Sequence, residues 1–129
     1  MITRQQQPTR RSCGQTVVAM LLGVPAADVI AEMGDKGTSG KQLAAFLQAR
    51  GFKAGPVARF RHPPAVDPRP KLPPLAIVRI DWGRDRKRTH WVLWAEKRFH
   101  DPLLVGDFTW AVGGGRLYSY MPIERPAST

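Results

Sequence analysis

Apolar residues in the first half of the chain recur at the spacing of helices. Residues 13–22 are apolar on most sides, so we expect a buried helix there. Two further helices are predicted, one opened by Pro25 and one that begins after Ser39. Each of the three helices is expected to end at a glycine, which readily takes the left-handed conformation after a helix: Gly23, Gly34 and Gly51.

Two serines mark the starts of predicted helices. Ser12 is followed three residues later by Gln15, and Ser39 by Gln42. This spacing fits a capping box, in which the serine side chain accepts from the backbone of the glutamine and the glutamine side chain accepts from the backbone of the serine. The first helix is therefore predicted to begin at Cys13.

After Gly51 the pattern changes to that of strands. Residues 75–82 and 89–95 are rich in branched and aromatic side chains, and the polar stretch 83–88 between them is typical of a hairpin loop. Residues 52–58 are predicted to be an edge strand, because the proline at position 56 cannot donate to a ladder.

The remaining segments complete an α+β arrangement. The proline-rich stretch 60–74 is expected to form an extended surface loop or crossover. Phe99 starts a further strand, and the three glycines at 113–115 form a turn before a last strand over 116–123. Helices followed by an antiparallel sheet define an α+β fold, and we expect residues 1–129 to form a single domain.

The charge of the chain is less ordinary than its apolar content. It has 43% hydrophobic and 23% charged residues, as in ordered globular proteins, but its net charge is +10. Such a field attracts acidic partners. Arg10, Arg11 and the basic stretch 84–88 therefore form either solvated loops or a docking surface for an acidic partner. No nucleic-acid motif accompanies the charge, so nucleic acid is not the partner that we expect. The four tryptophans are mainly core candidates, although Trp110 is also a candidate shield of the site from water.

Cysteine usage and hydropathy limit the compartment. One cysteine cannot form an internal disulfide, so nothing implies an oxidising environment. The polar N-terminus lacks the apolar core of a secretory signal, and the longest apolar run, 17–27, is too short and too interrupted to cross a bilayer. We expect a soluble protein without a transmembrane segment, which is cytoplasmic or is exported by a route that needs no cleaved signal.

Cys13 is the candidate nucleophile. A helix N-terminus and a nearby imidazolium lower the pKa of a cysteine thiol from about 8.5 to roughly 3.5–7.5. The predicted first turn places Cys13 at such an N-terminus. Gly14 is expected to let a substrate carbonyl approach the backbone amides of that turn.

Three other residues would complete the machinery. His90, at the start of a predicted strand, is the candidate base, and Asp101, on the next strand, is placed to fix its tautomer and stabilise the imidazolium. Gln7 is the candidate oxyanion donor, beside the backbone N–H of Cys13.

Plainer interpretations compete with catalysis. A lone cysteine is by default a small buried hydrophobic residue, although the glutamine, glycine and histidine around this pattern favour a nucleophile. His100 is an alternative base, but strand alternation directs it away from the face used by Asp101. His62 lies in the proline-rich loop and is expected to be solvated. A metal site is disfavoured, because zinc sites need closer ligands and usually paired cysteines.

The chain resembles the bacteriocin-processing cysteine peptidases, the papain-fold family that trims leader peptides after a double glycine, in a free-standing form. The resemblance spans roughly residues 7–102 and lacks the second cysteine that marks papain and the cathepsins. It rests on these positions in order: Gln7; Cys13 and Gly14; Gly37, Thr38 and Ser39; Leu43 and Leu47; Gly51 and Phe52; His90, Trp91 and Val92; Asp101 and Pro102.

The resemblance implies a papain-like fold and assigns roles to four residues. The glutamine lines the oxyanion hole, the cysteine attacks, the histidine is the general base and the aspartate orients it, which here are Gln7, Cys13, His90 and Asp101. The implied protein is a bacterial thiol protease that acts on peptide or protein substrates without a metal or organic cofactor. The net charge adds the expectation that some of these substrates are acidic. Two alternatives stay open: a deamidase or transamidase that acts on side-chain amides as a toxin or effector, and a non-catalytic basic binding module.

Overall fold

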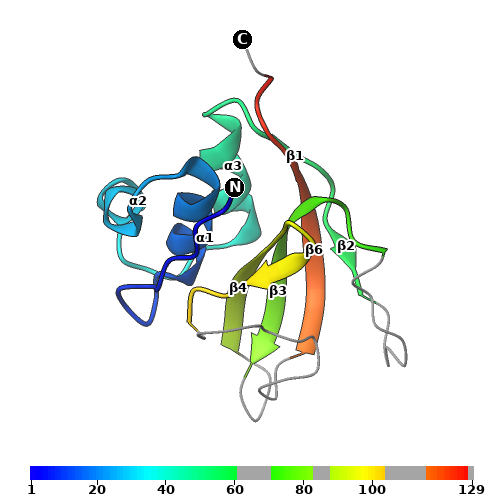
Figure 1. Ribbon diagram of the computed structural model, residues 1–129. Coiled ribbons are helices and arrows are strands. Elements are labelled where there is room, and N and C mark those ends of the chain that lie inside the picture. Colours follow the sequence, from blue (N-terminus) through cyan, green and yellow to red (C-terminus); the bar gives the residue numbers. More distant parts are fainter. Residues whose placement is uncertain (61–70, 83–87, 104–115, 128–129) are drawn as a thin grey trace.

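The computed structural model of the chain describes residues 1–60, 71–82, 88–103 and 116–127. Three helices come first: α1 (Cys13–Leu22), α2 (Ala26–Met33) and α3 (Gly40–Gln48). Six strands follow: β1 (Lys53–Ala54), β2 (Ala58–Arg59), β3 (Leu75–Trp82), β4 (Arg88–Ala95), β5 (Arg98–His100) and β6 (Arg116–Glu124). The helices pack together beside the sheet, which confirms the predicted α+β fold (Figure 1).

The sheet is antiparallel and has the order β1-β6-β3-β4-β5, with β2 also paired to β6. The predicted hairpin is present, because β3 and β4 pair along their whole length, from Leu75 with Ala95 to Trp82 with Arg88. Its loop lies outside the described residues, as do the predicted turn at 113–115 and most of the proline-rich stretch.

The predicted edge strand over 52–58 is wrong in one respect. It is divided into β1 and β2, each two residues long and each paired with β6. Gly55 still donates to the carbonyl of Pro122 in β6 at 2.8 Å, and the break follows at residues 56–57, which include the proline that has no N–H to contribute.

Only one of the two predicted capping boxes forms. Ser39 and Gln42 bond reciprocally at 2.8 and 3.2 Å, as predicted. Ser12 bonds instead to the backbone of Thr9, and the Gln15 side chain donates to two carbonyls of the loop between α2 and α3. No side chain therefore caps α1, although it begins at Cys13 as predicted.

The sheet buries apolar residues on both faces. The face toward the helices contributes Ile77, Trp91, Leu93 and Met121 to a core shared with α1, α2 and α3. The opposite face carries a second cluster with Val78, Ile80, Val92, Trp94, Phe99 and Leu117. Trp91 and Trp94 are thus core residues, as expected, whereas Trp110 lies outside the described residues.

Gly14 sets how closely α1 approaches its neighbours. A Cβ atom at this position would overlap Thr38 Oγ1 and would lie 3.1 Å from Leu43 and 3.2 Å from Trp91. A side chain at position 14 would therefore point into the interior. The structure thus shows a packing requirement for glycine between α1, the start of α3 and β4, while the role of Gly14 in admitting a substrate carbonyl stays a prediction.

We predict that Gly14→Ala lowers the free energy of unfolding by about 1–3 kcal/mol, the usual cost of overpacking. Gly37→Ala is the matched control, since a Cβ there meets no atom within 4 Å. Urea denaturation measures both variants. Adding Thr38→Ala to Gly14→Ala should recover part of the loss, and equal stabilities of the Gly14 and Gly37 variants would contradict the packing argument.

Candidate active site

Three separate elements bring the candidate site residues together. Cys13 is the first residue of α1, His90 is the third residue of β4, and Asp101 directly follows the last residue of β5. All three are buried, with exposed fractions of 9%, 4% and 1%. Asp101 was expected on the strand itself, and the structure places it one residue beyond the strand.

The His90 ring lies between the other two residues. Its Nε2 is 2.7 Å from Asp101 Oδ1, and the ring also hydrogen-bonds to Cys13. Because Nε2 is occupied by the carboxylate, Nδ1 is the nitrogen available to the sulfur. A histidine held in this way can carry a proton between the sulfur side and a reacting group while the carboxylate fixes its orientation.

The pKa of His90 reflects two opposed effects. Burial alone would lower it, but the hydrogen bonds to Asp101 and Cys13, together with the negative charge of both groups, outweigh burial and raise the pKa from 6.5 to about 9. A proton bound more tightly in the folded state stabilises the fold. This contribution is complete below pH 6.5 and is lost as the pH rises from 6.5 to about 9.

Gln7 lies against the segment that carries Asp101. Its backbone N–H donates to the carbonyl of Pro102 at 2.7 Å, and its side-chain Nε2 donates to the carbonyl of Thr9 at 2.7 Å. One hydrogen of Nε2 is therefore engaged inside the loop before Cys13, and the second remains for another acceptor.

Buried polar atoms without partners gather around these residues. Among the described residues, four buried side-chain oxygens make no hydrogen bond: Gln7 Oε1, Gln15 Oε1, Thr38 Oγ1 and Asp101 Oδ2. Two belong to candidate site residues, and two lie in or beside the first turn of α1. Folded proteins keep few such atoms, and a catalytic role is one of the recognised reasons for them.

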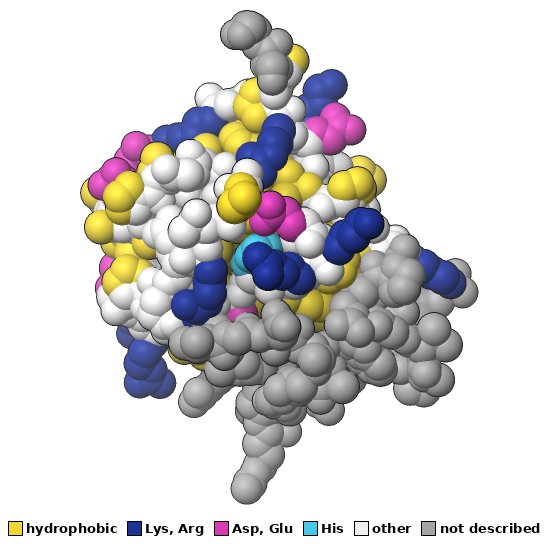
Figure 2. Space-filling model, in the orientation of Figure 1, with side chains coloured by type: hydrophobic (Ala, Val, Ile, Leu, Met, Phe, Trp, Pro, Cys, Tyr) yellow, Lys and Arg dark blue, Asp and Glu magenta, His cyan; other side chains and the backbone are white. Residues whose placement is uncertain are grey.

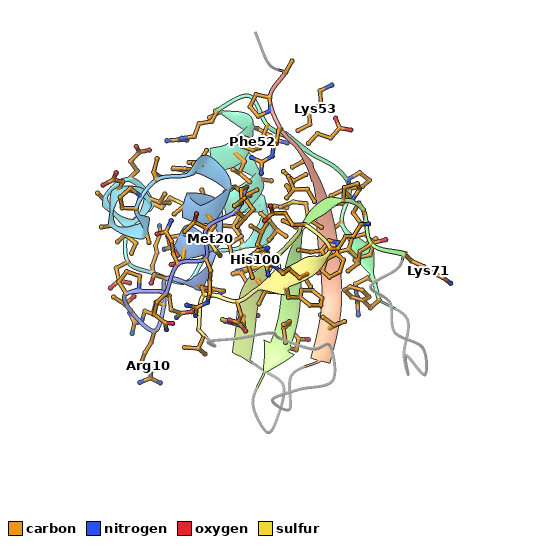
Figure 3. The ribbon with its side chains drawn as sticks, viewed as in Figure 1. Arg10, Met20, Phe52, Lys53, Lys71 and His100 are labelled. Atoms are coloured by element: carbon orange, nitrogen blue, oxygen red, sulfur yellow. The ribbon has the colours of Figure 1, made fainter. Side chains whose placement is uncertain are left out.

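The competing histidine is directed elsewhere. The His100 ring bonds to the carbonyl of Ala95 at 3.1 Å, and burial lowers its pKa. Figure 3 shows it on β5 within the sheet. His62 lies outside the described residues. In the described parts of the chain, no group of three His, Cys, Asp or Glu residues could hold a metal ion.

The basic residues that precede Cys13 point outward. Arg10 and Arg11 are exposed, and Arg10 projects from the loop before α1 (Figure 3). On the face seen in Figure 2, Lys and Arg side chains are dispersed among apolar and uncharged atoms. The second basic stretch, at 84–87, lies outside the described residues.

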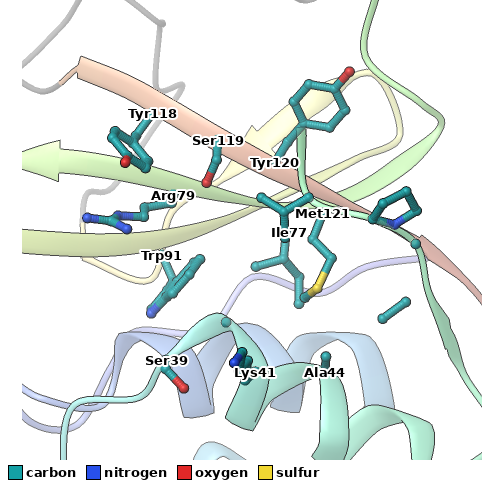
Figure 4. A pocket seen from close by; sticks show the side chains of 15 residues that line it. Ser39, Lys41, Ala44, Ile77, Arg79, Trp91, Tyr118, Ser119, Tyr120 and Met121 are labelled. Atoms are coloured by element: carbon teal, nitrogen blue, oxygen red, sulfur yellow. The ribbon is translucent and has the colours of Figure 1, made fainter. Parts of the chain in front are cut away.

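A pocket of about 560 Å³ lies between the start of α3 and strands β3 and β6 (Figure 4). Ile77, Trp91 and Met121 give it an apolar floor. Among the described residues that line it, Lys41 and Arg79 are charged and none is a carboxylate. Trp91 also donates to the carbonyl of Thr38, and its ring would lie 3.2 Å from a Cβ at Gly14, the residue after Cys13. Trp91 therefore links the pocket to the first turn of α1, although the candidate site residues themselves do not line the pocket.

This pocket was not predicted from the sequence, although the sequence contains one signal of it. Arg79 shares a face of β3 with Ile77, so alternation puts a charged residue at an inward position. Its guanidinium lies over the Tyr118 ring, 4.1 Å from the centroid, and bonds to Asp81 at 3.1 Å. Arg59 lies 3.9 Å from the centroid of the same ring. An arginine that points inward needs hydrogen-bonding or ring partners and room for its guanidinium. Its presence therefore indicates a groove and not a closely packed core.

The fold is that of papain-like peptidases. A solved structure of a double glycine motif protease from an AMS/PCAT transporter, in complex with the leader peptide, is similar to this chain with a TM-score of 0.68. The similarity covers 98% of this chain and 93% of that chain, at 17% sequence identity, and therefore concerns the fold. No family model matches the sequence, and no curated protein matches it. Within the described residues, none of the helices is long and apolar enough to span a membrane.

We predict that His90 titrates near pH 9 and that His100 titrates below 6.5. Histidine ring NMR signals followed against pH measure both midpoints. Asp101→Asn should move the His90 midpoint downward, because the carboxylate that holds its proton is gone. A wild-type His90 midpoint at or below 6.5 would contradict the geometry described here.

Proposed function

We propose that this protein is a papain-like cysteine peptidase that hydrolyses peptide bonds with Cys13, His90 and Asp101. The observation that carries the proposal is the buried His90 ring, bonded to Asp101 at 2.7 Å and to Cys13 on its other side. The fold shared with a double glycine motif protease supports the same chemistry. Membership of the double-glycine leader peptidase family, with residues 1–129 as one domain, is part of this proposal.

The first half of the reaction forms a thioester. The Cys13 thiolate attacks the carbonyl carbon of the peptide bond, and the oxyanion accepts from the backbone N–H of Cys13 and the remaining N–H of Gln7 Nε2. Because no side chain caps α1, the amides of its first turn stay available to negative charge. The C–N bond then breaks as His90 gives its proton to the leaving amine.

The second half releases the acyl group. Neutral His90 takes a proton from water, and the resulting hydroxide attacks the thioester carbon. The C–S bond breaks, which restores the Cys13 thiolate opposite a protonated His90, and the new carboxylic acid loses its proton to solvent. Every step uses groups of this chain and water, so the reaction proceeds without a cofactor.

The pocket beside Trp91 is the proposed binding site for substrate side chains. Its apolar floor suits an apolar side chain, and Lys41 and Arg79 suit an acidic one. A peptide that combines both, such as a leader peptide, fits this chemistry, and the protease of similar fold was solved with a leader peptide bound. The net charge of +10 would assist the approach of an acidic substrate. We place the activity in the bacterial cytoplasm, or outside the cell after export by a specialised route.

We predict that the protein cleaves members of a peptide panel that combine acidic and apolar residues before a double glycine. Cys13→Ala and His90→Ala should each lower the rate by roughly 10⁴-fold or more, and Gln7→Ala by about 10²–10³-fold. His100→Gln is the matched control and should keep the wild-type rate, because that ring bonds to a backbone carbonyl outside the site.

Mass spectrometry of the products separates the alternatives. Two fragments indicate a peptidase. An intact peptide heavier by one dalton indicates a side-chain deamidase that uses the same thioester chemistry. Unchanged peptides and proteins across the panel would contradict hydrolysis and favour a binding module.

A further inference from the structure

The segment that carries Asp101 leaves the sheet before it reaches the aspartate. The last ladder pairs of β5 join Phe99 to Trp94 and His100 to Leu93, so residues 101–103 have no strand partner among the described strands. Something other than the sheet must hold them, because the carboxylate has to stay within bonding distance of His90.

The N-terminal strap, residues 2–7, supplies that support. It donates to three successive carbonyls: Arg4 Nε to Asp101 at 2.8 Å, Gln7 N to Pro102 at 2.7 Å, and Gln6 Nε2 to Leu103 at 3.2 Å. The strap is anchored at its start by buried Ile2, whose N–H donates to the carboxylate of Glu96 at 3.1 Å.

Arg4 is the member of the strap that bonds to Asp101 itself. Its Nε donates to the Asp101 carbonyl, while its Nη2 donates to Gln6 Oε1 at 2.7 Å. Hydrogen bonds from a charged donor are stronger than neutral ones, and the planar guanidinium fixes both directions at once. Arg4 therefore ties the backbone of Asp101 to the residue that also holds Leu103.

We propose that Arg4 is a positioning residue: by holding the Asp101 backbone, it keeps the Asp101 carboxylate on His90. The inference rests on the proposed peptidase function for its kinetic consequence. Asp101 Oδ1 has only His90 and the Leu103 N–H as described partners, at 2.7 and 2.8 Å, so its place depends on this loop. A misplacement of about 1 Å in such a group can cost on the order of 10²-fold in rate.

The test compares Arg4→Met with Arg125→Ala, which removes one positive charge from an exposed residue near the C-terminus. Arg4→Met is expected to lower kcat at least about tenfold, with KM within about twofold of wild type, because orientation and not substrate binding is lost. Arg4→Lys should recover part of kcat, since its ammonium can still donate to the Asp101 carbonyl. A kcat for Arg4→Met equal to that of Arg125→Ala would overturn the proposal.

A second measurement does not depend on activity. The described titratable groups that act on His90 are Asp101 and Cys13, so a displaced carboxylate must change the His90 titration. Arg4→Met should move the NMR midpoint of His90 downward from about 9, and Arg125→Ala should leave it in place. If the wild-type protein hydrolyses nothing, the proposed function fails, and this titration still decides the role of Arg4.

Circular dichroism establishes whether Arg4→Met is folded. If it is not, Gln6→Ala takes its place, because Gln6 is exposed and braces both Arg4 and Leu103. Its His90 midpoint should move in the same direction by a smaller amount. An unchanged midpoint in the folded Gln6 variant would overturn the proposal.

Discussion

The hydrogen bond between His90 and Asp101 is the interaction on which the rest of the site depends. A histidine buried to 4% exposure would be neutral by default, because a low-dielectric interior disfavours its charge. Asp101, with Cys13 on the other side of the ring, reverses that preference and raises the pKa to about 9. The positive charge of His90 thus depends on three segments of the chain that the fold brings together.

Each segment is held by a different kind of contact. Backbone pairing between β3 and the whole of β4 fixes the position of His90. Close packing fixes Cys13, because the glycine that follows it leaves α1 no room to move toward the start of α3. Side-chain hydrogen bonds from the N-terminal strap fix the loop of Asp101, where the sheet has already ended. The strap also contains Gln7, so one segment bears the proposed oxyanion donor and supports the aspartate.

Local patterns in the sequence were sufficient for most elements, and long-range contacts explain the failures. The same spacing of serine and glutamine produced a capping box at Ser39 but not at Ser12. The difference arises because the Gln15 side chain donates to carbonyls about twenty residues away. Local capping rules do not predict such long-range hydrogen bonds. Most helix ends, strand periodicity and the order of the elements were accessible, since they depend on neighbours along the chain. The exception is α3, which ends at Gln48 and not at the predicted Gly51. The support of Asp101 by Arg4 and the pocket beside Trp91 depend on residues far apart in sequence, and they required the structure.

The reactivity of the sulfur is the most direct measure of the central claim, that His90, oriented by Asp101, activates Cys13 as a nucleophile. The chain has one cysteine, so alkylation by iodoacetamide reports Cys13 alone, with Cys13→Ser as the blank. We predict that the wild-type protein is alkylated at pH 7 at least about tenfold faster than His90→Ala, because the histidine that activates the sulfur is gone. Equal alkylation rates in the two folded proteins would contradict the account.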